Sequence, residues 1–451
     1  MPFVPFLLFT DVLLWLLIAA VVFYAWYCSR RPHLAAPWKR VFQSKAAMVC
    51  SVVLFFFVVV GVLDSLHYRA RLDGGAGYSP EVVSLLDRAL SHLRELRERT
   101  YSAPLATRLY AKEQMQLDGK TVSDFPRLAH GGAHLASEAE RPRDIAARIG
   151  LGLLCAAFAA VVLGLLVKRL QRRRPEVPWR AAGATLLVLF AVAFPVAFLA
   201  QGYHVLGTDK VGQDVLYQAL KSIRVSLIIG TLTTLVLLPL GMALGVMAGY
   251  FKGWMDDAIQ YLYTTLNSIP SVLLIAAAVL MMQVVIDRNA DWFATAAQRA
   301  DFRLLILCAI LGLTSWTGLA RLLRGEALKL SQLEYIQAAH AFGVADSRIL
   351  SRHILPNVAH IVIIAMVMDF SGLVLAEAVL SYVGVGVDPA TTSFGTMINA
   401  ARLEMGREPI VWWSLAAAFV FMFVLVLAAN LFADAVRDGF DPRVRMGFVP
   451  A

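Results

Sequence analysis

The chain has 451 residues, of which 59% are hydrophobic and 16% are charged, and its mean hydropathy is +0.66. A soluble domain carries about 25% charged residues, so this composition excludes an ordinary soluble protein and indicates a chain with several membrane spans. The net charge of +9 is compatible with nucleic-acid binding, but the basic residues cluster beside apolar segments, as they do in cytoplasmic membrane loops. We therefore expect membrane lipids, and no nucleic acid, as partners.

A membrane span needs about 20 mostly apolar residues to cross the hydrocarbon core of a bilayer. The first apolar segment lacks a basic start and a small-residue cleavage site, so it is interpreted as a retained span rather than a signal peptide. The sequence predicts an all-α polytopic membrane protein with about nine transmembrane helices, which lie near residues 6–27, 46–63, 148–167, 182–201, 222–250, 270–285, 304–321, 357–384 and 411–433.

The orientation of the spans follows from the short loops, because cytoplasmic loops carry an excess of lysine and arginine. Two basic loops follow the first and the third predicted span, and they contain Arg30, Arg31, Lys39, Arg40 and Lys45, and Lys168, Arg169, Arg172, Arg173, Arg174 and Arg180. Both loops are expected inside the cell. This places the N-terminus outside and, after nine crossings, the C-terminus in the cytoplasm.

Residues 64–147 form a long polar segment that this orientation places on the outer face. Ser79 and Pro80 suit a helix cap followed by a first-turn proline. An apolar stripe at helical spacing follows and predicts an amphipathic helix, with Val82, Val83, Leu85, Leu86, Ala89, Leu90, Leu93 and Leu96 on one face. Three roles are open for this helix: it lies on the membrane surface, packs on the rest of the chain or contacts a partner, and packing is favoured.

Metal-binding patterns are weak in this sequence. His130 and His134 lie four residues apart near Glu138, but HGGAH contains two glycines and favours a loop over a helix that would align two imidazoles. The cysteines lie in or beside apolar segments without CxxC spacing, so neither a disulfide framework nor a zinc site is expected from Cys28, Cys50, Cys155 and Cys308. We expect no metal site and no catalytic residue in this chain.

A turn motif precedes the long apolar segment near residues 222–250. The motif consists of Gly207, Thr208, Asp209, Gly212 and Asp214. Glycine and aspartate in such a pattern suit a tight turn in which the carboxylates accept hydrogen bonds from the backbone. A structural role for this outer-face motif is therefore favoured over contact with a solute.

The most distinctive stretch covers residues 316–357, between the seventh and the eighth predicted span, and is cytoplasmic in the predicted orientation. Ala338 and Ala339 let another surface approach a helix backbone closely, Gly343 can end that helix, and Pro356 suits the first turn of the next one. The pattern predicts a short helix that is held out from the membrane domain for a partner to bind. The alternative is an ordinary amphipathic cytoplasmic loop.

The eighth predicted span contains two carboxylates, Asp369 and Glu377, among apolar residues. Ionisable groups at bilayer depth are costly, and where they occur they face a bundle interior or a water-filled cavity. A functional role and a structural role are weighed equally for these two intramembrane acids.

The 316–357 stretch resembles the coupling loop of binding-protein-dependent ABC importer permeases, most closely the second permease of the dipeptide, oligopeptide and nickel family. The matching residues are Trp316, Ala320, Arg321, Arg324, Glu326, Leu328, Glu334, Tyr335, Ala338, Ala339, Gly343, Arg348, Ile349, Arg352, His353, Leu355, Pro356 and Asn357. Gln337 and His353 depart from the general signature, although the peptide subfamily tends to carry histidine at the second of these positions. The resemblance implies that an ATPase is coupled through Glu334, Tyr335, Gln337, Ala338, Ala339, Gly343, Arg348, Arg352, His353, Leu355 and Pro356.

The resemblance extends, with gaps, from Leu206 to Arg445, and the turn motif at 207–214 resembles the outer-face motif of the family. The resemblance implies a particular division of the chain. The last six spans then form an ABC importer permease core. The expected parts are N-terminal extra helices in 1–63, the extracytoplasmic segment with its amphipathic helix in 64–147, a third extra helix and basic loop in 148–181, and the core in 182–451 with its coupling loop at 322–356.

The resemblance implies a permease subunit of an ATP-driven importer in the bacterial inner membrane, with peptides as the leading cargo and nickel or another small solute as the alternative. It also implies three kinds of partner: a second homologous permease, one or two cytoplasmic ATPase subunits and an extracytoplasmic substrate-binding protein. The chain has no G-x-x-x-x-G-K-[ST] loop, so ATP and Mg are expected on the ATPase subunits and not on this non-enzymatic chain.

Two other functions are compatible with the intramembrane acids. A secondary transporter could use Asp369 and Glu377 as an ion relay, but this leaves the 316–357 stretch unexplained. An intramembrane hydrolase would need the two carboxylates together. Their spacing instead separates them by about 80° around one helix and about 12 Å along it.

Overall fold

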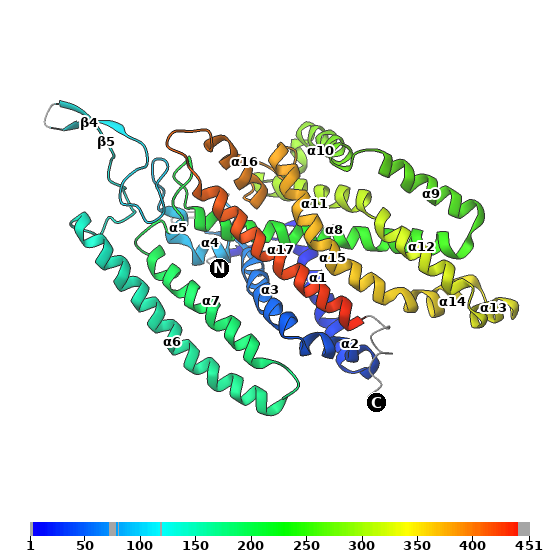
Figure 1. The fold of residues 1–451 in the computed structure, drawn as a ribbon. Coiled ribbons are helices and arrows are strands. Elements are labelled where there is room, and N and C mark those ends of the chain that lie inside the picture. The colour runs from blue at the N-terminus through cyan, green and yellow to red at the C-terminus, as the bar shows by residue number, and fades with distance from the viewer. Residues whose placement is uncertain (1–2, 72–77, 80, 118–119, 441–451) are drawn as a thin grey trace. The chain divides into compact units, whose positions relative to one another are not determined.

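The structure is a computed structural model that describes residues 3–71, 78, 79, 81–117 and 120–440. Within these residues, nine helical segments are long and apolar enough to cross a membrane, which confirms the all-α polytopic fold (Figure 1). The segments match the predicted spans, and most are longer than predicted. Pro80 and the end of the resembling region, at 441–445, lie outside the described residues.

Helices make up most of the described chain. The α-helices are α1 (Phe9–Ser29), α2 (Pro32–Gln43), α3 (Lys45–Asp64), α4 (Leu85–Ala89), α5 (Ser91–Glu95), α6 (Arg141–Arg173), α7 (Trp179–Ala200), α8 (Val215–Phe251), α9 (Gly253–Ser268), α10 (Ser271–Arg288), α11 (Ala296–Ser315), α12 (Thr317–Ser331), α13 (Glu334–Ala341), α14 (Asp346–Ile349), α15 (Leu355–Val383), α16 (Phe394–Glu404) and α17 (Trp413–Phe440). The remaining turns are two 3-10 helices, η1 (Glu138–Glu140) and η2 (Ala290–Trp292), and a π-helical turn, η3 (Leu350–Ile354). The candidate spans are α1, α3, η1 with α6, α7, α8, α10, α11 with α12, α14 through α15, and α17.

The chain divides into two compact units. The first contains the described residues up to 7 together with 42–226 and 389–428, and the second contains 8–41, 227–388 and the described residues from 429. The first unit therefore contains the extracytoplasmic segment together with residues 182–226 of the predicted permease core. The second unit contains the whole of the 316–357 stretch.

In the first unit, α6 and α7 form an antiparallel pair, and α7 also packs on α3 (Figure 1). The two helices approach closely at Gly152, where an added Cβ would lie 2.5 Å from the Cα of Pro195. Only glycine fits at this distance. The pair thus depends on a residue without a side chain in the middle of α6.

Residues 64–147, the predicted extracytoplasmic segment, contain all of the described strands except β1. β1 (Phe3–Pro5), β2 (His67–Ala70) and β3 (Val83–Ser84) form an antiparallel sheet in the order β1-β2-β3. Their register pairs Val4 with Arg69 and Tyr68 with Val83. β4 (Glu113–Leu117) and β5 (Lys120–Asp124) form a separate antiparallel hairpin.

The structure corrects the predicted amphipathic helix of this segment. The helix does not begin after Ser79, because Val83 and Ser84 belong to a strand. Ser84 is the true cap: its hydroxyl accepts a hydrogen bond from the Asp87 N–H over 3.0 Å, and the Asp87 carboxylate accepts one from the Ser84 N–H over 2.9 Å. This reciprocal capping box outcompetes the earlier serine, and Leu90 then separates α4 from α5.

The second unit contains most of α8, a helix of 37 residues. Its part in this unit, residues 227–251, is about 38 Å long at 1.5 Å per residue, against about 30 Å of hydrocarbon. At one end of this unit, α9, α12, α13 and α14 gather around an apolar cluster that includes Leu237, Trp316, Leu323, Ile336 and Ile349 (Figure 1). The surplus helix length therefore supports a packed region beyond the span itself.

Two glycines of α8 allow α12 to pack directly on it. An added Cβ at Gly245 would lie 2.5 Å from the carbonyl oxygen of Ala320, and one at Gly249 would lie 2.5 Å from that of Arg324. Backbone atoms cannot move aside as a flexible side chain can. The α8 backbone thus contacts the α12 backbone one turn apart at two points.

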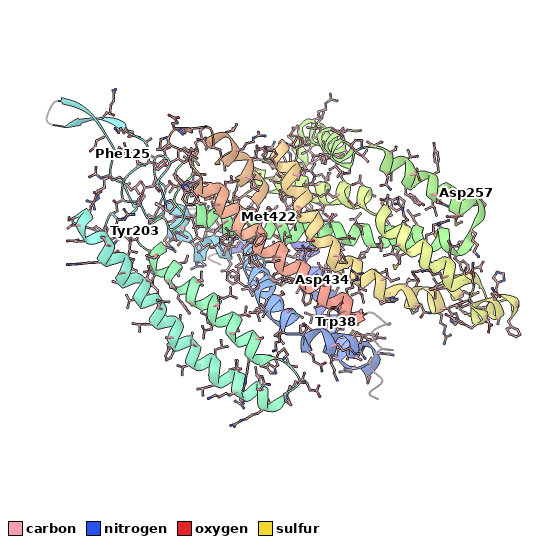
Figure 2. The ribbon with its side chains drawn as sticks, viewed as in Figure 1. Trp38, Phe125, Tyr203, Asp257, Met422 and Asp434 are labelled. Atoms are coloured by element: carbon pink, nitrogen blue, oxygen red, sulfur yellow. The ribbon has the colours of Figure 1, made fainter. Side chains whose placement is uncertain are left out.

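The short helix α2 lies against the end of α17 in the second unit. The Trp38 ring packs edge-on against the Phe440 ring, with centroids 5.2 Å apart (Figure 2). An added Cβ at Gly439 would lie 2.5 Å from Cγ2 of Val41. These contacts connect the loop after the first span with the last described turn of the chain.

Candidate functional site

The short helix predicted within the 316–357 stretch is α13, and it ends as predicted at Gly343. Gly343 has a φ of +73°. The N–H of Val344 donates to the carbonyl of Ala339 over 3.1 Å, and that of Gly343 donates to the carbonyl of His340 over 3.0 Å. This pair of bonds is a Schellman motif, which glycine favours because it adopts positive φ without a Cβ clash.

Only one side of α13 is held by the rest of the unit. Ile336 is buried, and Ala339 is half-buried against the same apolar cluster. Ala338 is exposed, and the Phe342 side chain just after the helix is 87% exposed. The sequence predicts one role for both alanines, but the structure separates them: Ala339 packs inward and Ala338 lies on the open face.

The other residues of the predicted coupling set lie on α13, between α13 and α15, or in the first turn of α15. Those on the open surface are Glu334, Tyr335, Gln337, Arg348, Arg352 and Pro356, and those that are half-buried are His353 and Leu355. The Tyr335 ring lies 6.0 Å from the His353 ring, and the Asn357 amide donates to the Tyr335 hydroxyl over 3.3 Å. The start of α13 therefore contacts the start of α15.

Pro356 is the second residue of α15, but α15 is not a new helix. α14, η3 and α15 form one helical segment from Asp346 to Val383. Proline has no N–H, so the carbonyl of Arg352, four residues earlier, lacks its usual donor. The wider π-helical turn lies just before this position and accommodates the missing bond. The helix therefore continues beyond its predicted start and reaches back toward α13.

Ion pairs and hydrogen bonds fix the helices around α13. Arg324 of α12 donates two hydrogen bonds to Asp256 of α9, from Nε to Oδ1 over 2.6 Å and from Nη2 to Oδ2 over 2.7 Å. The hydrogen bonds from Arg324 lower the pKa of the Asp256 carboxyl, so the pair is ionised at neutral pH. The Tyr250 hydroxyl donates to Asp346 over 2.7 Å and connects α8 to α14.

In the first unit, the outer-face motif forms the predicted tight turn. Gly207 and Gly212 have φ of +74° and +72°. Oδ1 of Asp209 accepts hydrogen bonds from the N–H groups of Val211 and Gln213, over 3.0 and 2.8 Å. An added Cβ at Gly212 would lie 1.8 Å from the carbonyl oxygen of Glu98, so the turn closes directly on the extracytoplasmic segment.

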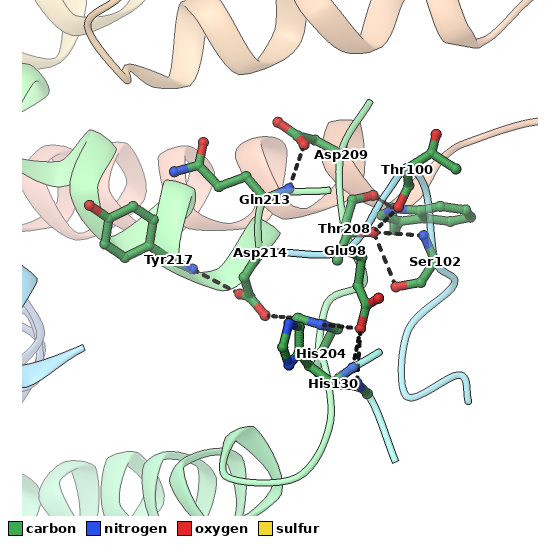
Figure 3. Close-up of polar contacts among 12 residues, drawn as sticks. Glu98, Thr100, Ser102, His130, His204, Thr208, Asp209, Gln213, Asp214 and Tyr217 are labelled. Carbon is green, nitrogen blue, oxygen red and sulfur yellow. Dashed lines mark hydrogen bonds and ion pairs between the residues drawn. The ribbon is translucent and has the colours of Figure 1, made fainter. Parts of the chain in front are cut away.

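A buried charge cluster that the sequence does not reveal lies beside this turn (Figure 3). Nδ1 of His204 lies 2.8 Å from Oδ2 of Asp214, and Nε2 of His204 lies 3.5 Å from Oε1 of Glu98. The Glu98 carboxylate also accepts three backbone N–H groups over 2.8 to 2.9 Å, from Ala129, His130 and Gly131. The cluster joins residues that lie far apart in the chain, so no local spacing could have indicated it.

In this cluster, hydrogen bonds and nearby charges shift the pKa values of His204 and Glu98 more than burial does. Burial lowers the pKa of His204, but its hydrogen bond to Asp214 and its ion pair with Glu98 raise it to about 9. Burial raises the pKa of Glu98, but the ion pair with His204 and the hydrogen bonds from the backbone lower it to about 2. At neutral pH, His204 is therefore an imidazolium beside the Glu98 carboxylate.

A second charge cluster connects the extracytoplasmic segment to α8. Nζ of Lys221 lies 2.8 Å from Oδ1 of Asp64 and 2.6 Å from Oδ1 of Asp87, and the Tyr217 hydroxyl donates to Asp87 over 2.7 Å. Burial raises the pKa of Asp87, but the charge and hydrogen bond of Lys221 lower it to about 2. The region predicted as an amphipathic helix thus packs on α8, which is the favoured one of its three predicted roles.

The histidines of HGGAH have other partners. Nε2 of His134 lies 2.9 Å from Oδ2 of Asp144, and the hydroxyl of Tyr203 donates to the same oxygen over 2.9 Å. Glu138 forms an ion pair with Arg108 over 2.6 Å. Within the described parts of the chain, no three His, Cys, Asp or Glu side chains are arranged to hold a metal ion.

The two intramembrane acids have different surroundings. Glu377 is 1% exposed and accepts a hydrogen bond from the Ser381 hydroxyl over 2.7 Å. Asp369 is half-buried and lines a cavity of about 470 Å³ in the second unit. Glu377 thus has a partner on its own helix, whereas Asp369 faces open space.

The chain is similar to known membrane components of transport systems. Residues 241–446 match the family described as binding-protein-dependent transport system inner membrane component. The oligopeptide transport system permease protein OppC of Mycobacterium tuberculosis (strain ATCC 25618 / H37Rv) is 31% identical over 297 residues, which cover 62% of this chain and 94% of the relative. The glutathione transport system permease protein GsiD of Pectobacterium atrosepticum is 33% identical over 284 residues, which cover 59% of this chain and 87% of the relative. A solved structure of the MetNI methionine ABC transporter is similar with a TM-score of 0.36 at 15% identity, over 49% of this chain and 97% of that chain.

The family match covers the part of the chain that contains α13. Residues 241–446 include α13, the helices that support it and the last spans. The two relatives are matched over most of their own length, which confirms the resemblance drawn from the 316–357 stretch. The chain belongs to the family of binding-protein-dependent transport system inner membrane components and is a permease subunit of an ABC importer.

Proposed function

We propose that the chain forms one half of a peptide translocation pathway in the bacterial inner membrane, beside a second homologous permease. The names of the relatives, oligopeptide and glutathione permeases, support a peptide cargo. The resemblance of the 316–357 stretch to the second permease of the peptide family supports a heterodimer. Nickel or another small solute is the alternative cargo.

In this proposal the permease core is 182–451, with its coupling loop at 322–356. The additional parts are 1–63, 64–147 and 148–181. The alignment with the OppC relative, which covers 62% of this chain, supports an added part of about this size. The basic loops after the first and third spans support an outer N-terminus and a cytoplasmic C-terminus.

One or two cytoplasmic ATPase subunits supply the energy, using ATP and Mg, and an extracytoplasmic binding protein delivers the cargo. The sequence has no phosphate-binding loop of its own. The open face of α13 is the single observation that carries the coupling role. Buried Ile336 and the Schellman motif at Gly343 fix the helix, while Ala338 offers a small side chain at which a groove can close on the backbone.

Replacing Ala338 by arginine tests this role without disturbing the packed side of α13. An arginine in a closely packed groove overlaps with the partner and carries an unpaired charge, so we expect the ATPase to be lost and transport to fall about tenfold or more. Ala258→Arg is the matched control, because Ala258 is an exposed alanine on α9 of the same unit. The measurements are co-purification of the ATPase and ATP-dependent uptake of labelled trialanine in the same membranes.

Three outcomes would count against parts of the proposal. Normal ATPase association and uptake with Ala338→Arg would show that α13 is not the coupling element. Normal ATPase association without trialanine uptake by the unaltered complex would favour the small-solute alternative. Uptake without any ATPase would favour an ion-coupled secondary transporter.

A further inference from the structure

The cavity that contains Asp369 has the composition of a binding site for a small solute. It has a volume of about 470 Å³ and lies between the junction of α11 with α12, the middle of α15 and the end of α17. Most of its lining side chains are apolar, among them Leu319, Ile361 and Met368. Ligand sites typically have volumes of about 300 to 1,000 Å³ and combine an apolar lining with a few polar groups.

Asp369 lies near the middle of α15, within the candidate membrane span Asp346–Val383. It is about 21 Å from the Val383 end of α15 at 1.5 Å per residue. A carboxylate at such depth does not face lipid, because its desolvation would cost several kcal/mol, on the order of the penalty for any unpaired buried ion. The Asp369 carboxylate must therefore contact water, a solute or protein.

The cavity contains one acid and one strong base that do not contact each other. Asp369 lies at the edge of the lining face of α15, and Arg437 reaches the cavity from the last turns of α17. Over the described chain, neither side chain forms a hydrogen bond or an ion pair. Within this part of the chain each charge is therefore without a protein partner, and the two have opposite signs.

We propose that this cavity binds a zwitterionic solute, with its ammonium group at Asp369 and its carboxylate at Arg437. Arginine pairs well with carboxylates because its guanidinium can donate two parallel hydrogen bonds. The apolar side chains between the two charges accept the body of the solute. A divalent metal ion is a poorer fit, because one carboxylate and the single imidazole of His360 are fewer ligands than such an ion requires.

This inference rests on the proposed peptide cargo and deepens it. A short peptide with free ends carries the two charges that the cavity offers. In this arrangement the permease contributes its own charge selection, at a place inside the membrane-spanning part of the chain. The ends of the peptide, and not its side chains, determine binding here.

A cysteine in the cavity wall tests the proposal in the complete transporter. Ile364→Cys places a thiol on the lining face of α15, in a background in which Cys28, Cys50, Cys155 and Cys308 are replaced by serine. The thiol is titrated with a cationic and with an anionic methanethiosulfonate reagent. Asp369→Asn should lower the ratio of the cationic to the anionic rate by about tenfold, and Arg437→Gln should raise it, because each removes one unit charge near the thiol.

Trialanine should protect the thiol in the unaltered cavity. Trialanine with an acetylated N-terminus should protect it at least about tenfold less well, because the ammonium group that meets Asp369 is gone. Asp257→Asn is the matched control, since Asp257 is an exposed aspartate on α9, and it should change neither the rate ratio nor the protection (Figure 2).

Two results would overturn the proposal. Equal protection by trialanine and its acetylated form would show that the cavity does not recognise the ammonium group. A thiol that reacts with neither reagent in the complete transporter would show that a partner subunit fills the cavity. A failure of the proposed function can be distinguished from these two results. In that case the unaltered complex would show no ATP-dependent uptake of trialanine, whichever labelling pattern the cavity thiol gives.

Discussion

At the residue scale, buried charges join parts of the first unit that are distant in the chain. Glu98 comes from the extracytoplasmic segment, His204 precedes α8, and Asp214 belongs to the outer-face motif. Burying such charges is costly unless each has a partner, and removing one partner of a buried pair typically costs about 3 to 5 kcal/mol. The motif therefore depends on a glutamate that lies more than 100 residues earlier in the chain.

The His204 cluster predicts how stability depends on pH. The folded-state pKa of His204 is about 9, above its ordinary 6.5, so its contribution is fully present below pH 6.5 and is lost as the pH rises through 9. We expect the purified protein to melt at a lower temperature at pH 10 than at pH 7. His204→Gln should melt lower at pH 7 and should lose less between the two pH values.

The matched comparison removes the effect of other groups that titrate in the same range. Both proteins contain the same tyrosines, cysteines and lysines, so only the difference between their pH profiles reports on His204. Identical profiles would contradict the assignment of a charged imidazole. The folded-state pKa of Glu98 is about 2, below its ordinary 4.5, so its contribution is present above pH 4.5 and is lost as the pH falls through 2.

At the scale of one element, the end of α13 depends on the backbone of Gly343. An added Cβ at Gly343 would meet no atom within 4 Å, so a substitution there acts through φ and not through a clash. Valine at positive φ costs about 1 to 2 kcal/mol, whereas asparagine tolerates this conformation.

Gly343→Val should therefore reorient the end of α13 and reduce co-purification of the ATPase severalfold. Gly343→Asn should retain most of the association. Co-purification from matched membranes measures both. If the two variants behave alike, the left-handed turn is not what positions α13.

Turn motifs were predicted more reliably from the sequence than the helix in residues 64–147. Gly343 and the Asp209 turn were predictable because the conformation depends on residues next to each other in the chain. The apolar stripe from Val82 to Leu96 predicts one helix, but Val83 pairs with β2 and Ser84 caps a shorter helix. Pairing with a distant strand overrides local periodicity, and sequence periodicity cannot show which strand is near.

At the scale of the whole molecule, the nine spans and the basic loops predict the orientation in the membrane. The last turns of α6, the loop after it and the start of α7 carry a dense group of lysines and arginines, and such regions stay in the cytoplasm. Residues 64–147 should then face outward. Arg99 suits a test of the outer side because its side chain is 80% exposed, and Glu176 suits a test of the inner side because it is also exposed.

We expect Arg99→Cys to react with a membrane-impermeant thiol reagent in intact cells, and Glu176→Cys to react only after permeabilisation. Both variants are made in the background without the four native cysteines. Reaction of Glu176→Cys after permeabilisation is the control for its accessibility. The reverse pattern in intact cells would contradict an outer N-terminus.

The sequence by itself determined the number of spans, the predicted orientation and the place of the short helix α13, because hydropathy, loop charge and glycine geometry are properties of neighbouring residues. Only the tertiary structure decided which of two adjacent alanines is open, Ala338 or Ala339, because that depends on the cluster against which α13 packs. It also brought Glu98 to His204, and Asp64 and Asp87 to Lys221. Such pairs form between distant segments only after the helices have packed, and a buried charge then needs a partner wherever in the chain that partner comes from.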